Sequence, residues 1–100
     1  MTTNSQAAPS PHLKGVGSLF EKARRLLDEG HLVESERVFD QAAAQGGDRS
    51  DADYFAGVVR LKLGDADGAA ERFQRALHAN PGNADALYGL GVVAEGGGAD

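Results

Sequence analysis

Residues 57–81 read GVVRLKLGDADGAAERFQRALHANP, and this stretch decides the fold. Two runs with apolar residues at helical spacing lie on either side of Gly64-Asp65. Glycine at this place permits the left-handed conformation that ends a helix, and Pro81 ends the second run because proline cannot continue a helix. The stretch therefore predicts two helices joined by a short turn.

The same pattern extends along the chain and predicts five helices. Ser18-x-x-Glu21 has the form of a capping box, so we expect the first helix to begin at Ser18 and to end at Gly30. The other helices are expected over about 32–45, from just after Ser50 to the Gly64 turn, over about 66–79 and over about 84–95. No segment shows the two-residue alternation of a strand, so the predicted fold is all-α.

Composition limits the classes of protein that the chain can represent. One hundred residues suffice for one small domain, and the net charge of −5 comes from 15 acidic against 10 basic residues. No basic surface is expected, which makes nucleic acid an unlikely partner class. The chain lacks cysteine and any apolar run of membrane-spanning length, so we expect no disulfide, no thiolate chemistry and no membrane partner. Residues 1–15 carry no signal-peptide pattern and are expected to form a flexible tail on a cytoplasmic protein.

Internal repetition is the strongest signal in the sequence. Several residues recur at a spacing of 34 positions, which indicates a repeated helix–turn–helix unit. The recurring sets are Gly30, Gly64 and Gly98; Phe20, Tyr54 and Tyr88; Ala23, Gly57 and Gly91; Phe39 and Phe73; and Ala42 and Ala76.

This period and these residue types resemble the tetratricopeptide repeat family. The second unit matches the family's small, turn, aromatic and proline positions with Gly57, Gly64-Asp65, Ala69, Phe73, Ala76-Leu77 and Pro81. The first unit is looser, since Ala23 replaces the glycine, Ser35 replaces the alanine and the closing proline is missing. The resemblance implies a right-handed α-solenoid over residues 16–100, with repeats at 16–49 and 50–83 and a partial repeat or capping helix at 84–100.

Each matched residue has a mechanical reason. Gly57 and Ala69 are expected to let the two helices of one unit approach closely, and Phe73 to fill the space between them. Gly91 repeats Gly57 and is expected to be a helix-packing glycine, whereas Gly89 has no counterpart. The G-x-G-x-x-A pattern of residues 89–94 imitates a dinucleotide-binding loop, but a turn and a helix precede it instead of a buried strand. We therefore interpret this pattern as accidental.

No other residues predict catalysis or a bound cofactor. His12, His31 and His78 fall in the predicted tail, a turn and a helix end, without metal-ligand spacing. The segment 65–68, Asp-Ala-Asp-Gly, lacks the glycine position and closing glutamate of a calcium loop. We predict no enzyme activity, no metal site and no cofactor, and we expect the carboxylates to lie mostly on solvated faces.

The resemblance also implies a partner-binding surface. In the family, the first helices of the units line a concave groove, and certain positions on them contact a protein or peptide partner. Carried over, these positions are Phe20, Arg24, Leu27 and Asp28; Tyr54, Val58, Leu61 and Lys62; and Tyr88, Val92 and Glu95. The surface is mostly apolar, with Arg24 and Lys62 as its positive charges. The version that clamps C-terminal carboxylates uses lysine and asparagine at several of these positions, and only Arg24 is suggestive of it here, so we do not expect that mode. An alternative is that Tyr54 and Tyr88 simply pack against each other.

The fifth predicted helix has no second helix of its own unit to cover it. Leu87, Leu90, Gly91 and Ala94 correspond to positions that contact such a helix, and this face carries few charges. Either the chain is the N-terminal piece of a longer array, or a second copy covers the face in a homodimer.

Together these patterns predict a protein–protein interaction module that binds a peptide or helix of another protein. Two alternatives stay open at this point. In the first alternative, the chain is an N-terminal regulatory or substrate-presenting segment of a larger enzyme. In the second, it is a self-assembly module without a foreign ligand.

Overall fold

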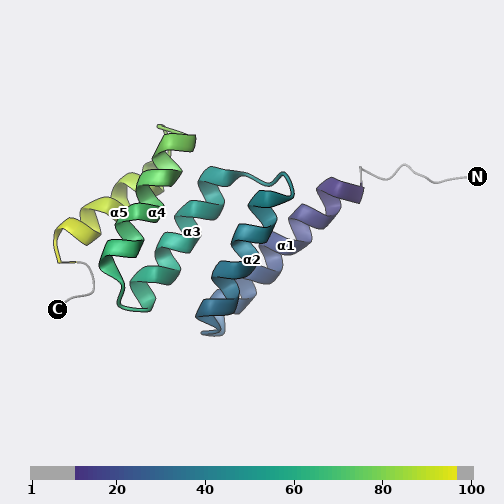
Figure 1. Ribbon diagram of the computed structural model, residues 1–100, viewed down its shortest axis with the longest axis horizontal. Coiled ribbons are helices and arrows are strands. Elements are labelled where there is room, and N and C mark those ends of the chain that lie inside the picture. The colour runs from purple at the N-terminus through teal and green to yellow at the C-terminus, as the bar shows by residue number, and fades with distance from the viewer. Residues whose placement is uncertain (1–10, 97–100) are drawn as a thin grey trace, which may run out of the picture.

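The computed structural model describes the backbone of residues 11–96 and the side chains of residues 17–96. Five helices follow one another: α1 (Pro11–Asp28), α2 (Leu32–Ala44), α3 (Arg49–Lys62), α4 (Ala66–Ala79) and α5 (Ala84–Ala94). The described range contains no strand, so the predicted all-α fold is confirmed. Figure 1 shows the helices standing side by side in an elongated stack, with α2 and α4 in front of α1 and α5.

The start of α1 differs from the prediction. The helix begins at Pro11 rather than at Ser18, which lies inside it, so Ser18-x-x-Glu21 is not a capping box. Residues 11–15 are helical, and the predicted flexible tail is wrong for them, whereas residues 1–10 lie outside the described part. Proline is well suited to the first position of a helix because its φ is already helical and its missing N–H is not needed there.

The starts of α3, α4 and α5 are fixed by side-chain caps. Asp48, Asp65 and Asn83 each accept a hydrogen bond from the backbone N–H three residues later, at 3.1, 2.9 and 3.0 Å. The predicted start of the third helix after Ser50 was therefore slightly late. The turns before α2 and α4 contain Gly30 and Gly64, both left-handed with φ near +85° and +82°, which confirms the predicted role of Gly64.

Two apolar clusters form the core. The first lies among α1, α2 and α3 around Phe39, and the second lies among α3, α4 and α5 around Phe73; both phenylalanines are fully buried. Val58 of α3 packs against both clusters, so α3 is the element that joins them. The buried members are Ala23, Leu27, Val38, Phe39, Ala43, Ala52 and Val59 in the first cluster and Ala69, Phe73, Ala76 and Ala86 in the second.

A row of aromatic rings crosses the same junction. Phe20 meets Phe39 edge-on at 6.1 Å between centroids, and Phe39 stacks on Phe55 at 5.1 Å. Tyr54 lies next in the row, 5.1 Å from Phe55 and 5.9 Å from Phe73. The row therefore links α1, α2, α3 and α4 through direct ring contacts.

Two glycines bring their helices close to Phe73, and one of them was not expected. A Cβ atom on Gly57 would lie 2.5 Å from the Phe73 ring, and a Cβ atom on Gly89 would lie 2.6 Å from it, on the side of α5. Gly91 is exposed and a Cβ there would meet nothing within 4 Å. The assignment of Gly91 as a packing glycine was therefore wrong within the described residues, because α5 contacts α4 through Gly89 instead.

The carboxylates of Glu36 and Asp53 are buried, contrary to the expectation that acidic side chains lie on solvated faces. Arg72 of α4 donates to Glu36 and Asp40 of α2 at 2.9 and 2.8 Å, and to Asp53 of α3 at 2.8 Å. Burial by itself would lower the pKa of Arg72, but its hydrogen bonds to Asp40 and Asp53 raise it, so the guanidinium stays charged. This charged cluster ties α2, α3 and α4 together.

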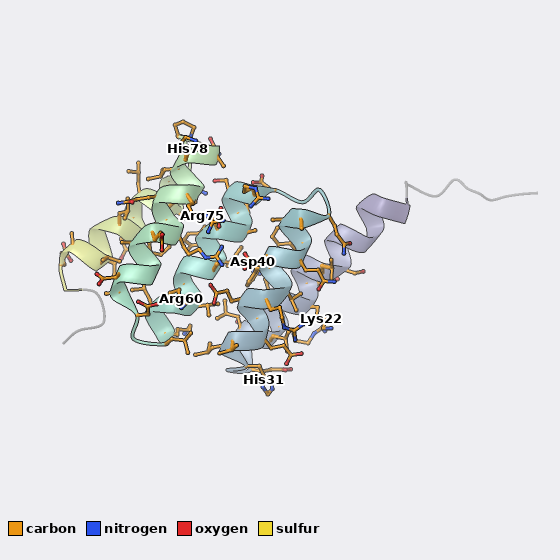
Figure 2. All side chains as sticks on the ribbon, viewed as in Figure 1. Lys22, His31, Asp40, Arg60, Arg75 and His78 are labelled. Carbon is orange, nitrogen blue, oxygen red and sulfur yellow. The ribbon has the colours of Figure 1, made fainter. Side chains whose placement is uncertain are left out.

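Arg60 of α3 extends the charged cluster. It donates to Glu36 and to Asp65, both at 3.0 Å, and the Glu36 hydrogen bond is the main reason that the Arg60 pKa is raised. Figure 2 shows Asp40, Arg60 and Arg75 on the side of the stack where α2 and α4 lie in front.

Candidate protein-binding face

We call the side chains of α1, α3 and α5 that point away from α2 and α4 the inner face. The helices that carry it are placed by direct contacts. Arg24 of α1 lies over the Phe55 ring of α3 with its Cζ atom 5.4 Å from the centroid, and α3 packs against α5. The sequence predicted that eleven residues of this face contact a partner. In the structure these residues differ in how much of each side chain is exposed.

On α1, one predicted contact residue is not available to a partner. Leu27 is buried in the first cluster with 8% of its surface exposed, because it points toward α2. Phe20 is half-buried against Phe39, and Arg24 and Asp28 are exposed. The contribution of α1 is thus the edge of Phe20 and the guanidinium of Arg24.

On α3, the predicted residues are mostly half-buried. Tyr54, Val58 and Leu61 pack against the second cluster with part of each side chain still open, and Lys62 is exposed. Burial, and next the charge of Asp85 on α5, raise the pKa of the Tyr54 hydroxyl. Tyr54 therefore lies close to the N-terminal end of α5.

On α5, Tyr88 is the largest exposed side chain of the inner face, with 76% of its surface accessible. Val92, one turn later, is half-buried, and Glu95 is exposed. Among the described rings, Tyr54 contacts Phe55 and Phe73, and no contact with Tyr88 is found. The alternative that Tyr54 and Tyr88 merely pack against each other is therefore not supported.

Two further acidic residues belong to this region, although they were not among the contact residues that were predicted from the sequence. Asp51 and Asp85 are exposed, and each lies three residues before a tyrosine, in the first turn of α3 and α5 respectively. Burial, and then repulsion from Asp48 and Asp85, raise the pKa of the Asp51 carboxyl above its ordinary 3.8. The available signal was the repeat itself, because Asp-Ala-x-Tyr occurs at residues 51–54 and again at 85–88.

The comparison with protein families agrees with the geometry. Two matches to the model described as tetratricopeptide repeat cover residues 20–71 and 56–100. This chain belongs to the tetratricopeptide repeat family. A search of curated proteins gave no match.

Tetratricopeptide repeats generally mediate protein–protein interaction and are typically non-catalytic. Across residues 17–96, no three histidine, cysteine or acidic side chains gather in a way that could hold a metal ion. Figure 2 shows His78 at the upper edge of the stack and His31 at its lower edge. None of the described helices has the length and apolar character that crossing a bilayer requires.

The residues predicted for self-association lie on α5. Leu87 is 57% exposed, and Gly91 and Ala94 are also exposed, whereas Leu90 packs partly against the second cluster. Three of the four residues are therefore open along one side of this tetratricopeptide helix.

An open depression of about 310 Å³ lies between α3 and α4, away from the residues of the inner face. Its lining residues are Arg49, Asp53, Glu71, Gln74, Arg75, His78 and Ala79. Positive and negative groups alternate there without a dominant sign, so the depression does not select one class of ligand.

Proposed function

We propose that this tetratricopeptide chain is a protein-interaction module that binds a peptide or helix of a partner protein in a groove along the inner face. The observation that carries the proposal is the exposure of Tyr88, since 76% of a large aromatic side chain lies open beside half-buried apolar neighbours. Exposed aromatic residues contribute most of the binding energy in many interfaces because they bury a large rigid surface.

The rest of the inner face supports the same proposal. Tyr54 and Val58 pack against the second cluster on one side, Val92 is half-buried, and all three offer their remaining surface to a ligand. A face that the fold already holds in place requires little reordering when a partner binds, which favours affinity. Binding, and not turnover, is the proposed activity.

A pull-down with the full chain as bait tests the proposal. Tyr88→Ala should remove at least one partner that the unchanged chain retains, as measured by quantitative mass spectrometry. The matched control is Val33→Ala, because Val33 is 71% exposed but lies on α2. If both variants retained every partner of the unchanged chain, the inner face would not be the binding surface.

Stability measurements separate binding residues from core residues. Phe73→Ala should lower the free energy of unfolding by roughly 3–5 kcal/mol because it empties a fully buried site. Tyr88→Ala should change it by no more than about 0.5 kcal/mol, as expected for an exposed residue. Tyr54→Ala is a poorer binding probe than Tyr88→Ala, since the Tyr54 ring contacts Phe55 and Phe73. Thermal melts followed by circular dichroism make the comparison.

Self-association through α5 is the second candidate function, and the exposure of Leu87 favours it. Sedimentation velocity over a range of concentrations decides it. A dimer that Leu87→Glu dissociates would support this candidate, and a monomer at high concentration would exclude it.

A further inference from the structure

The proposed binding face contains a duplicated element that pairs a carboxylate with an aromatic ring. Asp51 and Tyr54 lie three residues apart on α3, and Asp85 and Tyr88 lie three residues apart on α5. Residues three apart on a helix lie on the same face, so each carboxylate accompanies its ring. The two pairs are 34 positions apart and therefore take equivalent places in consecutive units.

The fold brings the two pairs next to each other. Helices α3 and α5 pack together, and both acidic residues lie in the first turn of their helix. The charge of Asp85 raises the pKa of both the Asp51 carboxyl and the Tyr54 hydroxyl, although burial is the larger cause for each. One end of the inner face thus combines negative charge with two tyrosines.

Several basic side chains lie around this part of the inner face. Asp85 is the only charged residue of α5. Arg49 lies at the same end of α3 but lines the depression between α3 and α4. Arg24 lies over Phe55, and Lys62 is in the last turn of α3, far along the helix from Asp51. Among the described residues, neither Asp51 nor Asp85 forms a salt bridge with a basic side chain.

Helix stabilisation alone is an incomplete explanation of these acids. A carboxylate in the first turn of a helix interacts favourably with the helix dipole, and Asp67 does the same on α4. However, burial first, and then repulsion from Asp48 and Asp85, raise the pKa of the Asp51 carboxyl, so its surroundings in the folded chain disfavour the charged carboxylate. A cation brought by a ligand would relieve this repulsion.

We propose that the partner segment is a basic amphipathic peptide whose lysine or arginine binds between Asp51 and Asp85 against the Tyr88 ring, while its apolar residues cover Val58 and Val92. This inference rests on the proposed function and names the chemistry of the partner. A cation over an exposed aromatic ring and beside carboxylates gains both cation–π attraction and charge complementarity. The same negative charge disfavours phosphate-rich ligands, so a protein segment is the occupant.

A random 12-residue peptide library displayed on phage tests the inference, with the full chain as the immobilised target. Peptides selected by the unchanged chain should combine apolar residues with lysine or arginine. Selection against the Asp51→Asn/Asp85→Asn double variant should keep the apolar residues and lose the basic ones. In fluorescence anisotropy, a selected peptide should bind the double variant about three- to tenfold more weakly, and the difference should shrink at high salt.

Two matched variants serve as controls. Asp67→Asn removes a first-turn acid from α4, outside the inner face, and should leave the affinity unchanged. Tyr88→Phe keeps the ring and should bind the peptide more tightly than Tyr88→Ala, which removes the ring.

The outcomes distinguish this inference from the proposed function. Selected peptides that depend on Tyr88 but show no basic residues would overturn the inference and leave the proposed function standing. Basic peptides whose affinity does not change in the double variant would also overturn the inference. A selection that yields no peptide dependent on Tyr88 would count against both.

Discussion

Gly89 and Gly91 lie two positions apart on α5, and their surroundings are opposite. The backbone at Gly89 approaches the Phe73 ring so closely that a Cβ atom has no room, whereas Gly91 faces open space. The sequence repeat assigned the packing role to Gly91, since it occurs 34 positions after Gly57. At the scale of one residue, the neighbouring helix decides whether a glycine is required.

Alanine at each of these two positions is expected to have opposite effects. Gly89→Ala should lower the free energy of unfolding by roughly 1–2 kcal/mol, because overpacking against Phe73 outweighs the better helix propensity of alanine. Gly91→Ala should raise it by about 0.5–1 kcal/mol, because glycine inside an exposed helix is unfavourable and nothing is displaced. Urea unfolding followed by circular dichroism measures both; equal destabilisation by the two variants would contradict the placement of α5.

At the scale of elements, α2 and α4 are held together largely by charge. Arg72 forms salt bridges with three carboxylates on two other helices. One of them is the carboxylate of Asp53, whose side chain is only 2% exposed. The second carboxylate oxygen of Asp53 is buried without a hydrogen-bond partner. The neighbouring units place Leu19 and Leu87 where Asp53 stands, so this contact is specific to the middle unit.

Removing Arg72 should therefore be costly. Arg72→Met is expected to lower the free energy of unfolding by about 2–4 kcal/mol, between the values for exposed and buried ion pairs, because Asp53 is left buried and less well compensated. Arg37→Met is the control, since the Arg37–Glu34 pair is 3.9 Å apart with the arginine side chain 71% exposed, and it should have little effect.

Combining Asp53→Leu with Arg72→Met distinguishes two causes of this loss of stability, namely the uncompensated charge of Asp53 and the lost packing of the Arg72 guanidinium. If the loss of stability comes from the uncompensated charge of the buried Asp53 carboxylate, the double variant should be clearly more stable than Arg72→Met alone. If instead the double variant were less stable than Arg72→Met alone, the lost packing of the Arg72 guanidinium would be the larger contribution to the loss of stability.

At the scale of the whole molecule, the two clusters unfold together only if α3 couples them. Phe55 stacks on Phe39 of the first cluster and contacts Tyr54, which touches Phe73 of the second. Val58 also joins the clusters, because it packs against both of them. The row of rings is therefore the main path by which a loss of packing in one unit reaches the next.

Phe55→Ala should weaken this coupling. We expect a loss of about 2–4 kcal/mol and a lower m-value in urea, because the two clusters then unfold less cooperatively. Val33→Ala, which alters an exposed residue on α2, should change neither quantity. An unchanged m-value for Phe55→Ala would show that Val58 and the backbone of α3 suffice for coupling.

The sequence by itself determined the local structure and the order of the helices. Turn glycines, caps and apolar spacing act within a few residues, so Gly64 and the five helices could be predicted, and the 34-residue repeat indicated the family. Phe39 and Phe73 were predicted as repeated apolar positions for the same reason, and both are fully buried. The start of α1 was the local exception, because Pro11 and a chance capping pattern compete as start signals.

Only the tertiary structure decided which side chains are available to a partner. Leu27 and Tyr88 were both predicted from the family's partner-contact positions, yet one is 8% and the other 76% exposed. The charged cluster around Arg72 and the approach of Gly89 to Phe73 join residues from different helices, and no local pattern encodes their distance. Burial and charge pairing depend on which helix lies opposite, so they follow from the packing of the stack and not from the sequence of any one helix.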